Sequence, residues 1–411
     1  MPAPTRSLTL ADVHEHVRRE CFNPGDSTGR VGVELERLTM VAGDHSLRPT
    51  QADLFGMIDR LTLPADARLT VEPGGQIEIS SLPHLGPAAA IAATAADLCA
   101  LEAALGAAGI RTAALGRDPA RPDRRVVRGP RYDAMEAYFD GDGGAGGAMM
   151  CSTASVQVNL DLGEPAGLPQ RWRMAHALGP VLIAAFANSP LAAGAPTGAR
   201  SSRQQIWALL DRSRSAPAVS LLSPADAWAR YALAARVMLV RDRPDHFQAV
   251  RADLPFERWI SEGHELGYPT LDDFSYHLTT LFPPVRPKGW LELRMIDAVP
   301  DPWWQVAVAV TTALLDDPEA FDTGERACGP ISDCWSEAAV HGLAHPGLAS
   351  ATRICFEAAI DALPRLGVER LTIAAAEEFF GRYVERGRCP GDDVLDAWTS
   401  GGQRMAMASP S

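Results

Sequence analysis

The stretch Thr70-Val71-Glu72-Pro73-Gly74-Gly75-Gln76-Ile77-Glu78-Ile79-Ser80-Ser81 places two carboxylates, Glu72 and Glu78, on either side of a Pro-Gly-Gly turn. Proline and glycine favour a tight turn, and the β-branched residues that follow favour a strand. Successive strand residues face opposite sides, so Ile77 and Ile79 can enter a core while Glu78 projects from the other face. An acid fixed in that position indicates that something cationic is held beside it.

Three other stretches repeat this alternation of apolar and polar residues, at 31–38, 155–162 and 291–295. In the first, Glu34 and Glu36 share the polar face about 7 Å apart along the strand, where two like charges repel each other. The polar faces of the other two stretches carry Gln157, Asn159 and Asp161 in one case, and Glu292 and Arg294 in the other. Four strands are therefore expected to present a polar face that is rich in glutamate.

The four strands favour a sheet with one apolar face packed on helices and one polar face open to solvent. Taken singly, each strand is more typical of an ordinary half-exposed sheet, because a solvated polar face is the default for antiparallel sheets. Taken together with the turn, they favour a binding site, and carboxylate oxygens without interleaved Cys or His suit Mg²⁺ or Mn²⁺. We predict an α/β (α+β) fold with a curved, mainly antiparallel sheet of about six strands, helices behind it and a funnel-shaped site on the carboxylate face.

The sequence between the strands predicts helices and one glycine-rich loop. Helical patterns cover 8–20, 50–62, 87–109, 168–187, 224–240, 303–316, 349–366 and 372–397. Gly141–Gly147 invites comparison with a phosphate loop, but it lacks the Gly-Lys-Ser/Thr ending and precedes a predicted strand, so we interpret it as the approach to a hairpin. Because the Glu-bearing strands are spread from residue 31 to residue 295, a division in two would split the site. We therefore expect one catalytic domain over residues 1–411, with its core at about 8–398 and a disordered tail from about 399.

Composition excludes several classes of partner. A net charge of −13 disfavours nucleic acid, and no apolar run approaches the ~18 residues that span a bilayer. The seven cysteines have no zinc spacing and are odd in number, which fits a reducing cytoplasm. Lys288 is the only lysine, so a mechanism that needs one has a single candidate.

Five blocks of the sequence together resemble a known family. They lie at 32–36, 72–78, 149–161, 202–207 and 276–297, in the order the family has them. The chain resembles the glutamate–cysteine ligases, most closely the actinobacterial type that starts ergothioneine synthesis, within the glutamine-synthetase-like carboxylate–amine ligases. The resemblance implies a glutamine-synthetase-like catalytic fold, with glutamate, cysteine and ATP as substrates, Mg²⁺ as cofactor, and γ-glutamylcysteine as product through a γ-glutamyl phosphate.

The resemblance also implies roles for individual residues. The implied metal ligands are Glu34, Glu36, Glu72, Glu78 and Glu292. Arg294 and Glu292 are the implied catalytic pair, with Arg294 on the phosphoryl group. The implied substrate-binding residues are Arg203 for the glutamate α-carboxylate, Gln157 and Asn159 for the amino acid, and Arg131 and Tyr132 for the cysteine pocket. For each of these alone, a structural role is about as common as a ligand role.

Alternatives remain open at this point. The chain could ligate glutamate to another amine, act as a phosphagen-type kinase, or bind metal without catalysis. Cys151 could be a nucleophile, although this ligation needs no protein thiol, and His277 could touch substrate, although a structural histidine is more common. We expect a cytoplasmic enzyme, a monomer or weak oligomer, with no nucleic-acid or membrane partner.

Overall fold

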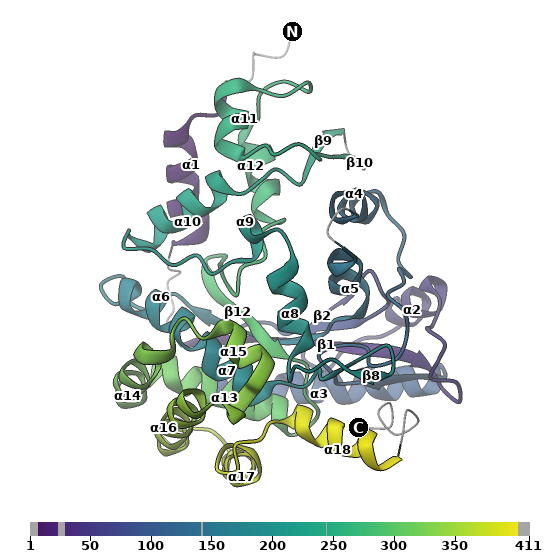
Figure 1. Cartoon of the computed structure of the whole chain (residues 1–411), viewed down its shortest axis with the longest axis vertical. Helices are drawn as coiled ribbons and strands as arrows, with labels where there is room; N and C mark the ends of the chain where they lie inside the picture. The colour runs from purple at the N-terminus through teal and green to yellow at the C-terminus, as the bar shows by residue number, and fades with distance from the viewer. Residues whose placement is uncertain (1–6, 24–28, 141–142, 244, 402–411) are drawn as a thin grey trace.

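An eight-stranded sheet lies between two groups of helices in the computed structural model, which describes residues 7–23, 29–140, 143–243 and 245–401 (Figure 1). Six strands follow the order β11-β12-β6-β1-β3-β2, and β4 and β5 also pair with β1, all in antiparallel fashion. The bounds are β1 (Arg30–Val41), β2 (Arg68–Val71), β3 (Ile77–Ser80), β4 (His84–Leu85), β5 (Ile110–Ala113), β6 (Ser155–Asp161), β11 (Val285–Pro287) and β12 (Trp290–Asp297). The predicted fold class is confirmed, with two short strands added to the expected six.

The register of the strands sets polar side chains in four rows across the sheet. These rows are Glu36–Glu78–Thr70, then Gln157–Glu34–Ser80–Arg68, then Arg286–Glu292–Asn159–Gly32, then Trp290–Asp161. Because alternate residues of a strand share a face, consecutive rows lie about 7 Å apart. The rows therefore order the polar face from its Glu36 end to its Trp290 end.

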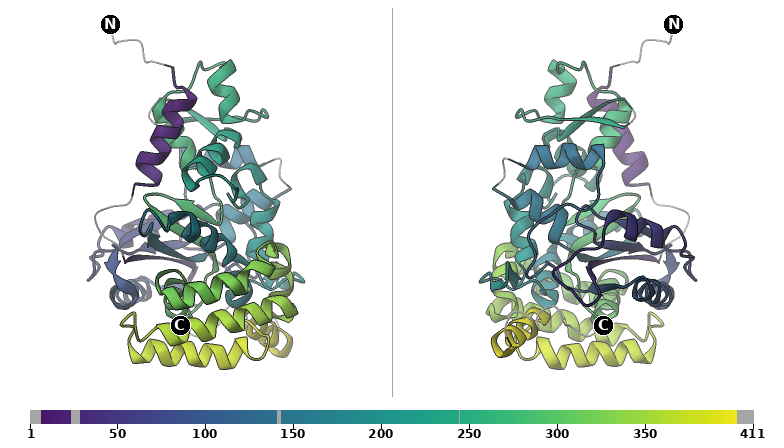
Figure 2. Two further views of the ribbon diagram at one scale, coloured as in Figure 1. Left: turned by 90° about the vertical axis from the view of Figure 1, so that its left-hand side faces the viewer. Right: turned by 90° about the vertical axis from the view of Figure 1, so that its right-hand side faces the viewer.

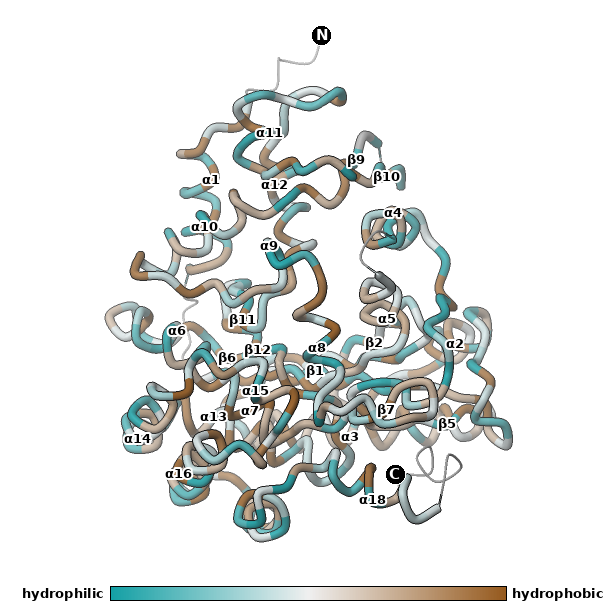
Figure 3. The backbone as a smooth tube through the Cα atoms, viewed as in Figure 1, coloured by the Kyte–Doolittle hydropathy of each residue, from teal (hydrophilic) through white to brown (hydrophobic). Residues whose placement is uncertain are grey.

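The apolar face of the sheet is fully buried. Its core residues Val33, Ile79, Val158 and Leu293 have no exposed surface. Helices α3 (Gly86–Ala107), α7 (Gly179–Phe186) and α13 (Trp303–Asp316) contact this sheet, and α14 (Pro318–Cys328), α16 (Pro346–Ala362) and α17 (Arg370–Phe379) pack outside α13. Figure 2 shows these helices as a layer below the sheet. Along the outer helices hydrophilic and hydrophobic residues alternate in colour, as expected for elements with one buried face (Figure 3).

Other helices and a hairpin rise on the opposite side of the sheet (Figure 1). They are α1 (Leu10–His16), α4 (Pro130–Phe139), α5 (Ala145–Ser152), α8 (Ser202–Leu209), α9 (Arg212–Ser215), α10 (Pro224–Ala234), α11 (Phe256–Glu262), α12 (Leu271–Leu278) and the hairpin β9 (Leu239–Arg243) with β10 (His246–Ala249). The remaining elements are η1 (Val17–Cys21), α2 (Gln51–Ile58), α6 (Leu168–Ala177), β7 (Leu191–Ala192), β8 (Ala195–Pro196), η2 (Gly329–Ile331), α15 (Trp335–His341), η3 (Gly342–Ala344), η4 (Phe380–Val384) and α18 (Pro390–Gly401).

The Pro-Gly-Gly turn joins β2 to β3 and is pinned to the helices above it. The Glu72 amide donates to the Gln76 carbonyl at 2.8 Å, and Gly75 has a φ of +87°, which glycine adopts without strain. A side chain at Gly74 would place its Cβ 2.0 Å from the carbonyl oxygen of Cys151 in α5. Glycine at this position thus lets the turn touch the backbone of α5.

Several predicted helices are shorter or divided. The segment 168–187 forms two helices, α6 and α7, because Pro180 in the first turn of α7 has no amide to continue the earlier helix. The helix expected at 224–240 ends at Ala234, and the chain then enters β9. The pattern at 372–397 is divided before α18, where Pro390 starts a new helix.

Two other expectations about the chain were wrong. The glycine-rich segment 141–147 leads into α5 rather than a strand: Gly143 and Gly144 have φ of +64° and +89°, and the helix begins at Ala145; residues 141–142 lie outside the described part. Disorder was expected from about residue 399, but residues 399–401 are helical, because α18 continues to Gly401. Residues 402–411 lie outside the described part.

Helix α3 is long and apolar enough to cross a membrane by length and composition alone, which differs from the expectation that no apolar run approaches that length. In the structure its residues Ile91, Leu98, Leu101 and Leu105 are buried, and it contacts β1, β5 and α13. Its apolar character is therefore accounted for by packing against the sheet.

Candidate active site

The polar face of the sheet is the floor of a cavity of about 790 Å³. Helices α4, α5 and α8 supply part of its wall, through residues that include Tyr132, Met149 and Trp207. Every predicted site residue lines this one cavity: Glu34, Glu36, Glu72, Glu78, Arg131, Tyr132, Gln157, Asn159, Arg203, Glu292 and Arg294. The structure therefore brings together side chains that the sequence spreads over more than 250 residues.

Four of the five glutamates are half-buried and repel one another. Burial, followed by the charges of Glu292 and Glu78, raises the pKa of Glu34 to about 7. Burial also raises the pKa of Glu36 and Glu78, and it raises that of Glu72 well above its usual range, with repulsion from neighbouring glutamates adding to each shift. These carboxylates are arranged as acceptors for a cation rather than as members of internal ion pairs.

Glu292 is the exception, because three cations already surround it. Its two oxygens accept from Arg286 at 2.6 and 3.1 Å, from Lys288 at 3.2 Å and from Arg294 at 3.0 Å. Burial acts to raise its pKa, but the charges of Arg286, Arg294 and Lys288 outweigh burial and lower it. A metal ion at Glu292 would have to displace at least one of these partners, so its role as a ligand stays a prediction.

Amide and hydroxyl groups surround the free carboxylates. Asn159 Nδ2 donates to Glu34 at 2.9 Å, Gln157 Nε2 lies 3.3 Å from Glu36, and the hydroxyls of Thr70 and Ser80 each donate to Glu78 at 3.0 Å. Asn159 Oδ1 is buried and has no hydrogen-bond partner among the described residues. A buried acceptor without a donor indicates that a ligand completes its hydrogen bonding.

Arg203 and Arg294, the two arginines predicted for the site, differ in which of their guanidinium N–H groups already have hydrogen-bond partners. Arg294 donates from Nη1 to Gln157 Oε1 at 2.6 Å and to Glu292 Oε2 at 3.0 Å, which holds its fork over the middle of the floor. Arg203 is buried; its Nη2 donates to the Arg294 carbonyl at 2.8 Å, and Asp297 lies 3.7 Å from Nη1. Its Nε has no partner among the described residues. Arg203 therefore braces β12 while keeping one N–H available.

Arg131 and Tyr132 open helix α4 at one wall of the cavity. The Arg131 guanidinium lies 5.0 Å from the ring centre of Tyr276, and it donates to the hydroxyls of Tyr276 and Thr279. Burial, followed by the charge of Glu72, raises the pKa of Tyr132 to about 12. At neutral pH this phenol stays protonated and can act as a hydrogen-bond donor.

The donor atoms of the floor fit a hard divalent cation. They are carboxylate oxygens, joined by the unpaired amide oxygen of Asn159, and within the described ranges no thiol or imidazole lines the cavity. As the side chains lie, however, no three His, Cys, Asp or Glu residues in the described ranges converge on one point. The glutamates would therefore have to move together to bind a cation.

Cys151 and His277 have structural roles. Cys151 is buried outside the lining of the cavity, and burial raises its pKa to about 11, so its thiol is not ionised at neutral pH. His277 Nε2 lies 2.9 Å from the carbonyl of Ala232, and burial lowers the pKa of this histidine to about 3. Neither residue faces the candidate site.

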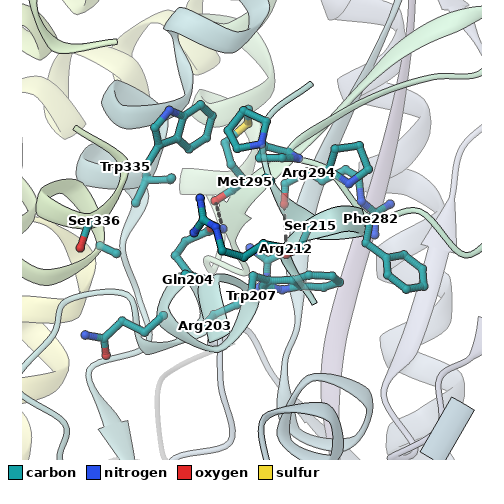
Figure 4. Close-up of a pocket in the computed structure, with 18 of the residues that line it drawn as sticks. Arg203, Gln204, Trp207, Arg212, Ser215, Phe282, Arg294, Met295, Trp335 and Ser336 are labelled. Atoms are coloured by element: carbon teal, nitrogen blue, oxygen red, sulfur yellow. Dashed lines mark hydrogen bonds between the residues drawn. The ribbon is translucent and has the colours of Figure 1, made fainter. Parts of the chain in front are cut away.

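A second, smaller cavity of about 280 Å³ adjoins the first, and Figure 4 shows residues that line it. The two share Arg203, Trp207, Phe282 and Arg294, which form a partition between them. Sequence reasoning did not identify Trp207 or Arg286 as lining the site. Arg286 could have been found, because it precedes Glu292 by six residues, and the Pro287-Lys288-Gly289 stretch between them favours a turn.

Comparison with known proteins identifies relatives of the whole chain. The model of glutamate-cysteine ligase family 2 matches residues 30–408. Glutamate–cysteine ligase EgtA of Mycolicibacterium smegmatis is 44% identical over 386 residues, covering 92% of this chain and 89% of the relative. EgtA of Mycobacterium tuberculosis is 40% identical over 403 residues, covering 96% and 91%. A glutamate–cysteine ligase of Francisella tularensis solved with AMP has a TM-score of 0.54 at 12% identity, covering 94% of this chain and 88% of that one, which is a likeness of fold alone.

Proposed function

Because the chain belongs to glutamate–cysteine ligase family 2, we propose that its carboxylate-lined cavity is where the glutamate γ-carboxylate is joined to the cysteine amine. The enzyme is an ATP-dependent glutamate–cysteine ligase that forms γ-glutamylcysteine. The product is used for ergothioneine biosynthesis, a proposal supported by the sequence motifs and by relatives that are EgtA proteins.

The reaction has two steps. A γ-carboxylate oxygen of glutamate attacks the γ-phosphorus of ATP, the bond to the β,γ-bridging oxygen breaks, and ADP leaves. The cysteine amine then attacks the acyl carbon of γ-glutamyl phosphate, inorganic phosphate leaves with the bonding electrons, and the nitrogen loses a proton. Both steps concentrate negative charge on phosphoryl oxygens, so the site must supply positive charge and hold water away.

Arginine is suited to binding these negatively charged phosphoryl oxygens, because its planar guanidinium group makes bidentate hydrogen bonds and remains protonated. Arg294 contacts the transferring phosphoryl group, with Glu292 and Gln157 fixing its orientation. Arg203 binds the α-carboxylate of glutamate through its free Nε side. The amide of Asn159 binds the amino acid beside it.

Cysteine enters beside α4. Arg131 and Tyr132 form its pocket, and the tether of Arg131 to Tyr276 and Thr279 keeps the helix start against the cavity. The protonated Tyr132 phenol donates a hydrogen bond to the incoming amino acid.

Glu34, Glu36, Glu72 and Glu78 hold Mg²⁺, with Mn²⁺ as a substitute, and Glu292 joins them if one of its basic partners is displaced. Bound Mg²⁺ neutralises phosphate charge and orients the triphosphate. The mutual repulsion of these half-buried carboxylates supports this assignment, because a bound cation would neutralise it.

The proposal rests on one observation: the glutamates line the same cavity as Arg203 and Arg294. The test measures ADP release with glutamate and ATP, with and without cysteine, and identifies products by mass spectrometry. We expect stoichiometric γ-glutamylcysteine and ADP. Sustained ADP release without an amine acceptor would indicate a kinase, and a different γ-glutamyl amide from a mixture of amino acids would indicate another acceptor.

The proposal also covers the cellular location, the partners and the oligomeric state of the protein. All seven cysteines are free thiols, which supports a reducing cytoplasm as the location. The net charge of −13 supports small-molecule partners rather than nucleic acid. We propose a monomer or weak oligomer, which analytical ultracentrifugation over a range of concentrations tests.

A further inference from the structure

The smaller cavity beside the carboxylate-lined cavity has no role in the proposed reaction. It is lined by residues of α8, of α15 and of the loop that leads into β11, and its volume is about 280 Å³. Small-molecule sites begin at about 300 Å³, so the cavity suits a small ligand. Figure 4 shows Trp335 and Ser336 on one side of it and Phe282 on the other.

Much of the wall of the smaller cavity is apolar. Trp335 of α15 is half-buried, and its ring takes the space of a missing side chain in α7, since a Cβ on Gly179 would lie 2.0 Å from Trp335 Cη2. The glycine therefore gives the indole a fixed position. Pro283 and Pro284 also line the cavity. Flat indole and prolyl rings favour a ligand with a flat apolar body.

Arg212 gives the smaller cavity a free positive charge. Its side chain is exposed, and no described residue forms an ion pair or a hydrogen bond with its guanidinium. Arg203 and Arg294 also line the cavity, although each is already paired with a carboxylate. Among the described residues of the lining the one acid is Asp333, which is exposed. The unpaired charge is therefore that of Arg212, and its planar guanidinium suits a carboxylate.

The wall between the two cavities provides a physical link. Arg203 and Trp207 lie four residues apart on α8, share a face of that helix and line both cavities. The ring centre of Trp207 lies 5.8 Å from that of Phe282 and 5.9 Å from the Arg203 guanidinium. The indole Nε1 is buried without an acceptor among the described residues, so no hydrogen bond from it fixes the ring. A ligand that packs against this wall therefore acts on side chains that also face the carboxylate-lined cavity.

We propose that the smaller cavity is an effector site for a small aromatic carboxylate, whose carboxylate pairs with Arg212 and whose ring packs against Trp335. The site goes beyond the proposed ligase function, and only its effect on catalysis rests on that function, through Arg203. A bound carboxylate adds negative charge beside Arg203 and presses on Trp207, so glutamate binds more weakly. The effector is a partial inhibitor, and by linkage glutamate weakens effector binding by the same factor.

Calorimetry with three model compounds tests the site without turnover. The probe, 3-phenylpropionate, carries a carboxylate on a flat apolar body, whereas phenethylamine replaces the carboxylate with an ammonium and propionate lacks the ring. We expect saturable binding of 3-phenylpropionate and no binding of phenethylamine. Propionate should bind at least about tenfold more weakly, because it buries no ring.

Variants of the lining assign the binding to this cavity. Arg212→Gln removes the free charge and should weaken 3-phenylpropionate binding roughly tenfold. Ser336→Phe fills the cavity from an exposed position and should abolish binding. Neither Arg212 nor Ser336 lines the carboxylate-lined cavity. Arg173→Gln is the matched control, since Arg173 is exposed on α6 and lines neither cavity, and it should bind the probe as the wild type does.

Kinetics test the link to glutamate. Increasing 3-phenylpropionate should raise the KM for glutamate by about fivefold and then reach a plateau, because both ligands are bound at once. Arg212→Gln should need roughly tenfold more probe for the same rise. The affinity for 3-phenylpropionate, measured by calorimetry in saturating glutamate, should fall by the factor by which the KM rises.

Four results overturn the assignment. They are no heat of binding at millimolar 3-phenylpropionate, unchanged binding in Arg212→Gln and Ser336→Phe, a KM for glutamate that rises without limit, and one that stays constant while the probe is bound. A rise without limit would place the probe in the glutamate site itself. Failure of the proposed function is a different result: the wild-type enzyme would form no γ-glutamylcysteine and still bind 3-phenylpropionate with an affinity that depends on Arg212.

Discussion

The five glutamates that line the cavity on the polar side of the sheet are in two opposite electrostatic states. Glu34, Glu36, Glu72 and Glu78 are half-buried among like charges, whereas Glu292 is fully buried with three cations around it. Alternation in the sequence predicted that all would share a face, because that depends only on the period of a strand. It could not predict their different partners, because Arg286 and Lys288 reach Glu292 only through the register of β11 with β12.

Glu78→Gln removes one repelling charge and keeps the shape of the side chain. We expect turnover to fall by about 100-fold or more, because the variant loses one carboxylate oxygen of the proposed metal site for phosphoryl transfer. The thermal midpoint of the metal-free variant should equal or exceed that of metal-free wild type, and Mg²⁺ with ATP should stabilise wild type more.

Two further glutamates serve as controls for this variant. Glu292→Gln should instead lower stability, by about 3–5 kcal/mol, because it leaves buried cations unpaired. Glu164→Gln, at an exposed position, should change neither activity nor stability. Retained activity in Glu78→Gln, with equal stabilisation by Mg²⁺ and ATP, would place Glu78 on an ordinary solvated face.

The pKa of Glu34 makes stability depend on pH. Its pKa is raised in the folded state from 4.5 to about 7, so the folded protein holds this proton more tightly than the unfolded chain. The contribution to stability is therefore complete below pH 4.5 and is lost as the pH rises through about 7. We expect the unfolding free energy of the metal-free enzyme to decline over this window more steeply than that of Glu34→Gln, by on the order of 1–3 kcal/mol. Urea titrations in EDTA at a series of pH values measure the difference, and parallel profiles for the two proteins would contradict the expectation.

At the scale of elements, the turn between β2 and β3 sets the position of two site glutamates. The sequence of this turn predicted its tight conformation. It could not predict why the first glycine is needed, because the backbone that a side chain at Gly74 would meet belongs to α5, more than 70 residues away in the sequence. Helix boundaries were the weakest predictions for a similar reason. The periodicity of 168–187 continues through the break at Leu178, where only the proline at 180 marks the start of a second helix.

Gly74→Ala tests the contact of the turn with α5. The new Cβ would fall 2.0 Å from the Cys151 carbonyl oxygen, so the turn or the helix must shift. We expect a loss of about 1–3 kcal/mol or more in unfolding free energy, together with reduced activity through displacement of Glu72 and Glu78. Gly56→Ala in α2 is the matched control, because nothing lies within 4 Å of the position that its new methyl group would take, and alanine favours helix by about 1 kcal/mol. Equal stability of the two variants would show that the turn has room to adapt.

At the scale of the whole molecule, one hydrophobic cluster reaches from Leu8 to Val384 and includes both the sheet and the helices around it. The scattered positions of the Glu-bearing strands predicted that the chain would not divide, since the site needs strands from both halves. The sequence did not predict which strands pair with each other. β1 pairs with β6 across more than 110 residues, and no local sequence signal specifies that pairing.

The single-domain organisation stays a prediction, and unfolding tests it. We expect one cooperative transition, with tryptophan fluorescence and far-ultraviolet circular dichroism giving the same midpoint, because the continuous core couples the layers. Calorimetric and van't Hoff enthalpies should agree. Two separated transitions, or limited proteolysis that releases a stable fragment, would indicate independent domains.

The strand order has a consequence for synthesis on the ribosome. β1 can pair with β3 early, and β6 can join when about two fifths of the chain has emerged, but β12 follows only after residue 290. Until then β6 is an open edge, with unpaired backbone groups beside Gln157 and Asn159. Such non-local pairing slows folding and lengthens the time in which that edge can join another chain. The strand that carries Glu292 and Arg294 therefore both completes the floor of the cavity and covers the edge that would favour aggregation.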